Sequence, residues 1–149
     1  MKNNTFAEDY RIFKTYEAEY DAAKDEDGKE AARVKVRALY ADMETRGEDY
    51  GRIYMLYKEA QERGNEYIDL HDCIWDKDVK ALVDSLRKYG IEYFTFSSTW
   101  SSTVETAWFF LQNGCTLEGM KELHGSEKIT FGKAEKEFET VHGYLFKVN

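Results

Sequence analysis

The sequence predicts an α/β (α+β) fold, in which an N-terminal helical hairpin or three-helix layer packs on a small mixed or parallel sheet with βαβ units. Three observations predict it. Apolar residues recur at three- and four-residue steps through residues 1–64. Strand-like and helix-like segments alternate through residues 65–149. The 149 residues include no proline and no Ser/Gly-rich linker, so we expect a single domain, 1–149, with a helical portion and an α/β portion.

Three helices are expected in the helical portion. The first begins at a capping-box pattern, Thr5 to Glu8, and ends in a polar cluster that closes on Gly28, a residue able to take a left-handed cap. The second is expected over residues 29–46 and the third over residues 48–63, each followed by a glycine. The first helix carries a stripe of rings: Phe6, Tyr10, Phe13, Tyr16 and Tyr20.

Strands and helices alternate in the α/β portion. Strands are expected at residues 67–71, 91–96, 115–123 and 141–148. Asp76 is expected to cap one helix, and the capping box Ser102 to Glu105 to begin another. Their predicted buried stripes are Val79, Leu82, Val83 and Leu86, then Val104, Ala107, Trp108 and Leu111. Residues 124–140 fit either a loop or a hairpin. This order favours a parallel or mixed sheet with the N-terminal helices over one face.

Composition excludes several classes of function. The net charge of −8 is spread over both portions, which argues against direct nucleic-acid binding and against adhesion to anionic membranes. The sequence shows no apolar segment typical of a secretory signal or a membrane span, so we expect a cytoplasmic protein. Two cysteines, Cys73 and Cys115, cannot form a disulfide framework or a four-ligand zinc site, and both are expected to be free thiols.

The hydroxyl-rich loop 97–103 is the best candidate for a ligand site. It lies between a predicted strand and a predicted helix, where ligands bind in open α/β sheets and where a helix N-terminus favours anions. The preceding strand, if parallel, ends nearby. The candidate residues are Ser97, Ser98, Thr99, Ser101 and Ser102 with His71 and Asp72. The alternative is that the serines only cap the following helix.

No catalytic residue, metal or cofactor is predicted. The phosphate-loop, nucleophile-elbow and zinc-protease motifs do not occur. Ser98, His71 and Asp72 could form a Ser–His–acid group, but no spacing requires it. His71 and Cys73 could share a face of an extended segment, yet no third or fourth metal ligand lies near them in the sequence.

Two surfaces could contact a protein. Tyr10, Tyr16 and Tyr20 on the first helix, and Trp100 in the loop, are of the residue types enriched at interfaces. The basic line Lys29, Arg33 and Arg37 is expected to pair with acids of the neighbouring helix. Those acids are Glu17, Asp21 and Asp25.

Several segments within residues 65–120 carry a resemblance to known proteins. They are residues 94–102, 104–108 and 114–119, with Asn65-Glu66-Tyr67 and Ile74-Trp75-Asp76. Together they cover most of residues 65–120 and resemble a family of short uncharacterised proteins encoded on conjugative and plasmid-like elements of gut Firmicutes. The resemblance implies no catalytic residues. It implies a setting in which small acidic proteins act as accessory factors that bind host or element proteins.

Two functions are therefore expected, from different classes. The first is a non-enzymatic protein-binding accessory protein of a mobile element, one form of which is an anti-CRISPR-like inhibitor of a host defence nuclease. It would act on a protein partner, as a monomer or small homo-oligomer. The alternative is a small-molecule or phosphate-binding α/β domain, or an enzyme, that uses loop 97–103.

Overall fold

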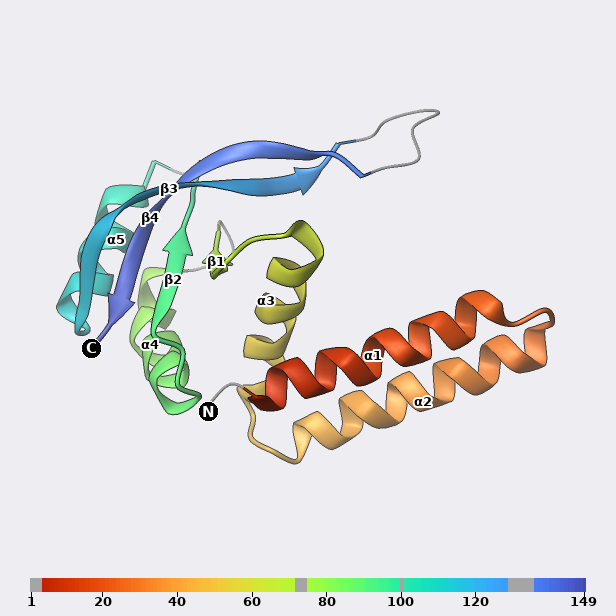
Figure 1. Cartoon of the computed structure of the whole chain (residues 1–149). Coiled ribbons are helices and arrows are strands. Elements are labelled where there is room, and N and C mark those ends of the chain that lie inside the picture. Colours follow the sequence, from red (N-terminus) through yellow and green to blue (C-terminus); the bar gives the residue numbers. More distant parts are fainter. Residues whose placement is uncertain (1–3, 72–74, 100, 129–135) are drawn as a thin grey trace. The chain divides into compact units, whose positions relative to one another are not determined.

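The computed structural model describes residues 4–71, 75–99, 101–128 and 136–149 (Figure 1). Its helices are α1 (Asn4–Ala22), α2 (Glu26–Glu44), α3 (Tyr50–Arg63), the 3₁₀ helix η1 (Asp76–Asp78), α4 (Val79–Lys88) and α5 (Thr103–Gln112). Its strands are β1 (Ile68–Leu70), β2 (Tyr93–Phe96), β3 (Cys115–Glu127) and β4 (Phe138–Val148). The predicted α+β class is confirmed.

Two compact units divide the chain, Met1–Met55 and Leu56–Asn149. The single domain and the position of the N-terminal helices over a sheet face stay predictions. None of the helices in the described ranges combines the length and the apolar character that a membrane crossing needs.

In the first unit, α1 and α2 form a helical hairpin (Figure 1). The sequence-based expectation for its turn was wrong. Gly28 does not end the first helix in a left-handed conformation but lies in the first turn of α2. Asp25 caps α2, because its carboxylate accepts a hydrogen bond from the Gly28 amide at 2.8 Å. Thr5 likewise lies inside α1, which begins at Asn4, so the first capping box is not used.

A buried polar cluster joins α1 to the start of α3 within this unit. The Asp9 side chain, in a residue only 2% exposed, accepts hydrogen bonds from the Tyr50 hydroxyl and, at 2.6 Å, from the Arg46 guanidinium. Burial raises the pKa of the Tyr50 hydroxyl. Phe6 stacks on the Tyr50 ring at 4.8 Å. The buried carboxylate is therefore both hydrogen-bonded and ion-paired, as burial of a charge requires.

The second unit holds a four-stranded mixed sheet in the order β1-β2-β4-β3. β1 and β2 run parallel, and β4 is antiparallel to both β2 and β3. The mixed sheet is one of the two predicted forms. The hairpin is the correct alternative for the segment after residue 123, because β3 continues to Glu127 and β4 begins at Phe138.

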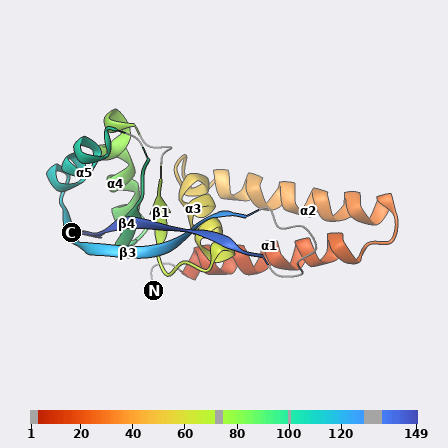
Figure 2. The same cartoon turned by 90° about the horizontal axis from the view of Figure 1, so that it is seen from above.

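Helices α4 and α5 lie on one face of this sheet (Figure 2). The core on that face is aromatic: Phe94 and Phe96 of β2 and Phe146 of β4 surround Phe110 of α5, with ring centroids 5.0–5.3 Å from it. The predicted stripe of α4 is confirmed, since its four members are all buried.

The predicted buried stripe of α5 was wrong. Val104 is 74% exposed, Trp108 53% and Leu111 43%, whereas Thr106 and Phe110 are buried. The helix is apolar almost all round, so hydrophobicity alone does not select its inner face. The rings of β2 and β4 select it by packing against Phe110.

The caps predicted for α4 and α5 also differ. Ser102 is the N-cap residue of α5, but its side chain makes no capping hydrogen bond. Asp76 opens η1 and does not cap α4. Its carboxylate instead accepts a 2.6 Å hydrogen bond from the Thr106 hydroxyl, which joins η1 to α5.

The face assignment of α5 predicts unequal losses of stability for two aromatic truncations. Phe110→Ala removes the buried ring and should lower the free energy of unfolding by about 3–5 kcal/mol. Trp108→Ala, two residues earlier, should lower it by about 1 kcal/mol or less because that ring is half exposed. Urea denaturation followed by circular dichroism measures both. A loss of free energy of unfolding that is larger for Trp108→Ala than for Phe110→Ala would contradict the assignment.

Candidate functional site

The polar residues of the candidate site lie at one edge of the sheet. In the parallel pair, Asp69 of β1 is in register with Thr95 of β2, so both strands end at the same level. His71 directly follows β1 and Ser97 directly follows β2. The carboxyl ends of parallel strands therefore bring together two segments that are 26 residues apart in the sequence.

A pocket of about 500 Å³ opens beside these strand ends. One side is lined by Asp69, His71, Ser97, Ser98 and Thr99, with Arg63 from the end of α3. The other side comes from the β3–β4 hairpin and is lined by Gly125, Ser126, Glu139, Val141 and His142. The volume falls in the usual range of small-molecule pockets, about 300–1,000 Å³.

Asp69 is the most buried polar residue of the pocket lining, at 7% exposed. The hydroxyls of Thr95 and Ser97 each donate a hydrogen bond to its carboxyl oxygens at 2.7 Å. Burial raises the pKa of Asp69, because the charged form is poorly solvated, and the two hydroxyl donors partly oppose this shift. Both oxygens of the carboxyl are thus oriented by hydroxyls of β2 and of the residue directly after it.

A chain of three charged groups lies next to Asp69. His71 Nε2 is 3.0 Å from Glu59 Oε1, and an Arg63 guanidinium nitrogen is 2.8 Å from the same oxygen. Contact with Glu59 raises the pKa of His71, while burial opposes the rise. Contact with His71 in turn lowers the pKa of Glu59. The imidazole is therefore stabilised as a cation close to the Asp69 carboxyl.

The other predicted residues of the ligand loop have different positions. Ser101 is exposed and Ser102 is the N-cap residue of α5, and neither is among the residues that line the pocket. Asp72 and Trp100 lie outside the described residues.

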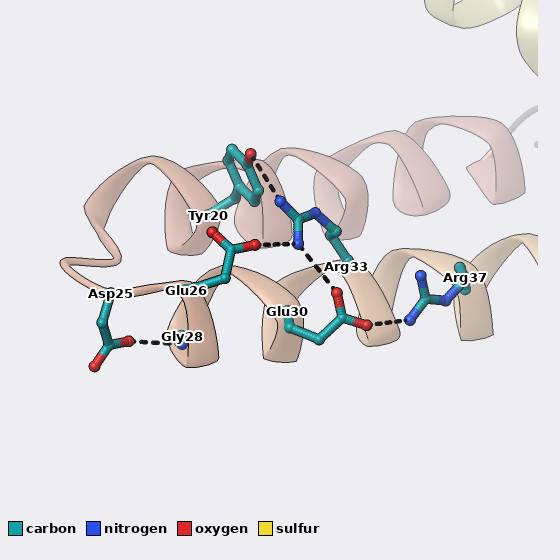
Figure 3. A network of polar contacts seen from close by, with 7 residues as sticks. All are labelled: Tyr20, Asp25, Glu26, Gly28, Glu30, Arg33 and Arg37. Atoms are coloured by element: carbon teal, nitrogen blue, oxygen red, sulfur yellow. Dashed lines mark hydrogen bonds and ion pairs between the residues drawn. The ribbon is translucent and has the colours of Figure 1, made fainter.

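Two rings of the predicted tyrosine surface contact side chains of α2. The Arg33 guanidinium lies over the Tyr20 ring, 5.3 Å from its centroid (Figure 3), and Lys35 lies over the Tyr16 ring at 5.7 Å. Tyr10 is half-buried on α1. The Tyr16 and Tyr20 rings therefore take part in the contact between the two helices of the hairpin.

The predicted partners of the basic line were wrong. Arg33 pairs with Glu26 at 2.7 Å and with Glu30 at 3.1 Å, and Arg37 pairs with Glu30 at 2.6 Å (Figure 3). These acids belong to α2 itself. They lie three or seven residues from the arginines, so they share a helix face with them and can pair within the helix.

Sequence reasoning missed four ionisable residues of the pocket lining, Arg63, Asp69, Glu139 and His142, and also Glu59, which contacts Arg63 and His71. Asp69 had a signal, as a carboxylate placed between two apolar residues of a short strand. The others had none, because they come from a helix end and a hairpin whose positions depend on the tertiary fold.

The described residues contain no group of three or more His, Cys, Asp or Glu side chains that could hold a metal ion. Cys115 is a buried free thiol, and burial raises its pKa to about 11, which makes it a poor nucleophile. Cys73 lies outside the described residues.

The contact between Glu59 and His71 predicts a pH-dependent effect. Glu59→Gln should lower the pKa of His71, which NMR titration of the imidazole measures directly. The pair stabilises the fold while both groups are charged, fully between about pH 4.5 and 6.5. This stabilisation is lost as the pH rises through the raised pKa of His71, or falls through the lowered pKa of Glu59. Glu62→Gln, one turn along and paired with Lys58, is the matched control. An unchanged His71 titration in Glu59→Gln would contradict the assignment.

A comparison with known proteins places most of this unit in a family. A family model described as "Domain of unknown function (DUF7698)" matches residues 52–148. No curated protein and no solved structure matches the chain. Because the matched segment is well over half of the chain and contains the whole sheet and pocket, the protein belongs to the DUF7698 family.

Proposed function

We propose that the protein binds a small polar molecule in the pocket at the carboxyl ends of β1 and β2. One observation carries the proposal: two strand ends, the end of α3 and the β3–β4 hairpin enclose about 500 Å³ with side chains that include carboxyl, imidazole, guanidinium and hydroxyl groups. Such convergence of polar groups around a defined cavity is typical of ligand sites.

The charges of the lining favour a ligand without a large net charge. Arg63 is cationic and the pKa of His71 is raised, but both side chains already contact Glu59. Asp69 and Glu139 add acidic groups to the same pocket. An inorganic phosphate would gain little from cations that are already paired, and it would lie near these acids. A molecule with several hydroxyl or amide groups can use both donors and acceptors, so we propose a nucleoside, a sugar or an amino acid.

The contacts of Ser97 and His71 favour binding over catalysis by this pair. A Ser–His nucleophile needs a hydrogen bond from the hydroxyl to the imidazole. Here the Ser97 hydroxyl donates to Asp69, and His71 Nε2 contacts Glu59. Both groups are therefore held in place by carboxylates, which suits a preorganised binding site.

The proposal predicts that ligands protect the fold and that blocking the pocket abolishes the effect. Thermal unfolding is followed with nucleosides, monosaccharides, amino acids and inorganic phosphate. A compound present at 100 times its Kd should add about 2.7 kcal/mol to the free energy of unfolding. Ser98→Tyr, which fills the pocket, should remove the shift. Ser101→Tyr, three residues later on an exposed site, should keep it.

Two outcomes of this experiment would count against the proposal. One is a panel in which no compound other than phosphate shifts the midpoint. The other is a shift that survives in Ser98→Tyr, which would place the binding site elsewhere.

A second function, binding of a protein partner, is favoured by the exposed face of α5. Val104, Trp108 and Leu111 lie at i, i+4 and i+7 on that face, where a soluble helix more often carries polar residues. The proposed partner is the one expected from the sequence, a host protein or a protein of the mobile element. The most specific version of this proposal is a host defence nuclease.

This second proposal predicts that a charge on the α5 face abolishes inhibition of a CRISPR effector nuclease in a purified cleavage assay. Trp108→Glu should lose inhibition while it keeps the wild-type far-UV spectrum. Glu105→Gln, which changes a polar residue in the first turn of the same helix, should retain it. Absence of inhibition by the wild-type protein would exclude the tested nuclease as the partner.

A further inference from the structure

One wall of the pocket is the distal part of the β3–β4 hairpin, residues 121–127 and 138–143, here termed the hairpin arm. Gly125 and Ser126 of β3 and Val141 and His142 of β4 contribute to this wall. The opposite wall comes from β1, β2 and the end of α3. The position of the arm therefore decides whether the pocket is closed or open.

The base of the arm is fixed to the sheet. Gly143 lies so close to β2 that a Cβ atom on it would be 2.9 Å from the Phe96 carbonyl oxygen. β4 continues from this point in register with β2, with Tyr144 opposite Phe96. Beyond Gly143 the arm leaves β2, because no β2 residue is paired with it there in the described register.

Asn65 holds the outer edge of the arm. Its side-chain amide nitrogen donates to the His124 carbonyl oxygen at 2.9 Å, and its side-chain oxygen accepts from the His124 amide at 2.9 Å. Both backbone groups of one edge-strand residue are thus paired by one side chain, as a neighbouring strand would pair them. The contact lies only one residue from Gly125 in the pocket wall.

The end of α3 presents Asn65 for this contact. Gly64 has φ +74°, a left-handed conformation that ends the helix, and the Asn65 amide donates to the Ala60 carbonyl at 2.9 Å. The backbone before the Asn65 side chain is therefore fixed by a helix cap, so little freedom is lost when its amide binds His124.

A nearby ion pair contributes less to this attachment. Lys121 is 2.9 Å from Glu66 and lies over the Tyr67 ring. The Glu66 side chain is 64% exposed, and exposed ion pairs are worth little because water screens them. Asn65 differs in that it makes two hydrogen bonds, and both are to the backbone of the arm rather than to a side chain.

We infer that Asn65 is the positioning residue of the pocket: its side chain latches the hairpin arm over the cavity, and small molecules enter and leave when the latch opens. This inference rests on the proposed function for the identity of the pocket as a binding site. The latch itself is a property of the free protein and is measured without a ligand.

Hydrogen exchange followed by mass spectrometry tests the latch. In Asn65→Ala, exchange in the arm should be roughly tenfold faster, the effect of losing two hydrogen bonds that keep the arm attached. Exchange in β2, α4 and α5 should not change. Asn113→Ala is the matched control, because the Asn113 side chain also donates to a backbone carbonyl, that of Phe109 at 2.8 Å, but within α5. Glu66→Gln removes the ion pair alone and should have a smaller effect than Asn65→Ala.

Access to the pocket is measured separately, by alkylation of a cysteine placed at Ser98. The labelling rate of this residue, read from its peptide, should rise by a similar factor when Asn65→Ala is added to Ser98→Cys. Adding Asn113→Ala should leave the rate unchanged. A purely structural role of Asn65 would instead raise exchange throughout the second unit.

The outcomes separate the latch from the proposed function. Unchanged exchange in the arm, acceleration throughout the unit, or unchanged labelling at position 98 would each overturn the latch. Faster exchange and labelling, together with a compound panel that gives no shift, would support the latch and overturn the ligand-binding function.

Discussion

The parallel register of β1 and β2 is the constraint on which the second unit depends. It places Asp69 beside Thr95, and alternation along the strands turns both away from the face that carries Phe94 and Phe96. The apolar side chains can then pack on α4 and α5, while Asp69 lines the pocket and accepts a hydrogen bond from Thr95. A slip of one residue would bury a carboxylate among aromatic rings and expose the core.

The aromatic core makes this register costly to change. Phe94, Phe110 and Phe146 are completely buried and contact one another from a strand, a helix and a second strand. Because close-packed rings tolerate little displacement, they hold β2 and β4 in a fixed relation. Gly143 extends the same constraint to the hairpin, since only a residue without a side chain allows β4 to pass so close to the Phe96 carbonyl.

The pocket contains groups that are unfavourable for stability. Burial of the Asp69 carboxyl costs free energy that two hydroxyl donors offset only in part, as its raised pKa shows. The Glu59, His71 and Arg63 chain stabilises the fold only while its charges are paired, and an apolar cluster could serve stability equally well. Rigid, partly desolvated polar groups at the edge of a well-packed sheet are what the proposed ligand site would require.

The fold class and the order of helices and strands follow from the sequence alone, because hydrophobic periodicity acts within a few residues. The caps expected at Thr5 and Asp76 and the helix end expected at Gly28 were wrong. The sequence also placed His71 and loop 97–103 at strand ends. Only the tertiary structure decided which face of α5 is buried, since that helix is apolar nearly all round and Phe110 is selected by rings from distant strands. The same holds for the pocket: Arg63, Asp69 and Glu139 meet there because strand order and the curvature of the hairpin bring them together, and neither is encoded by local spacing.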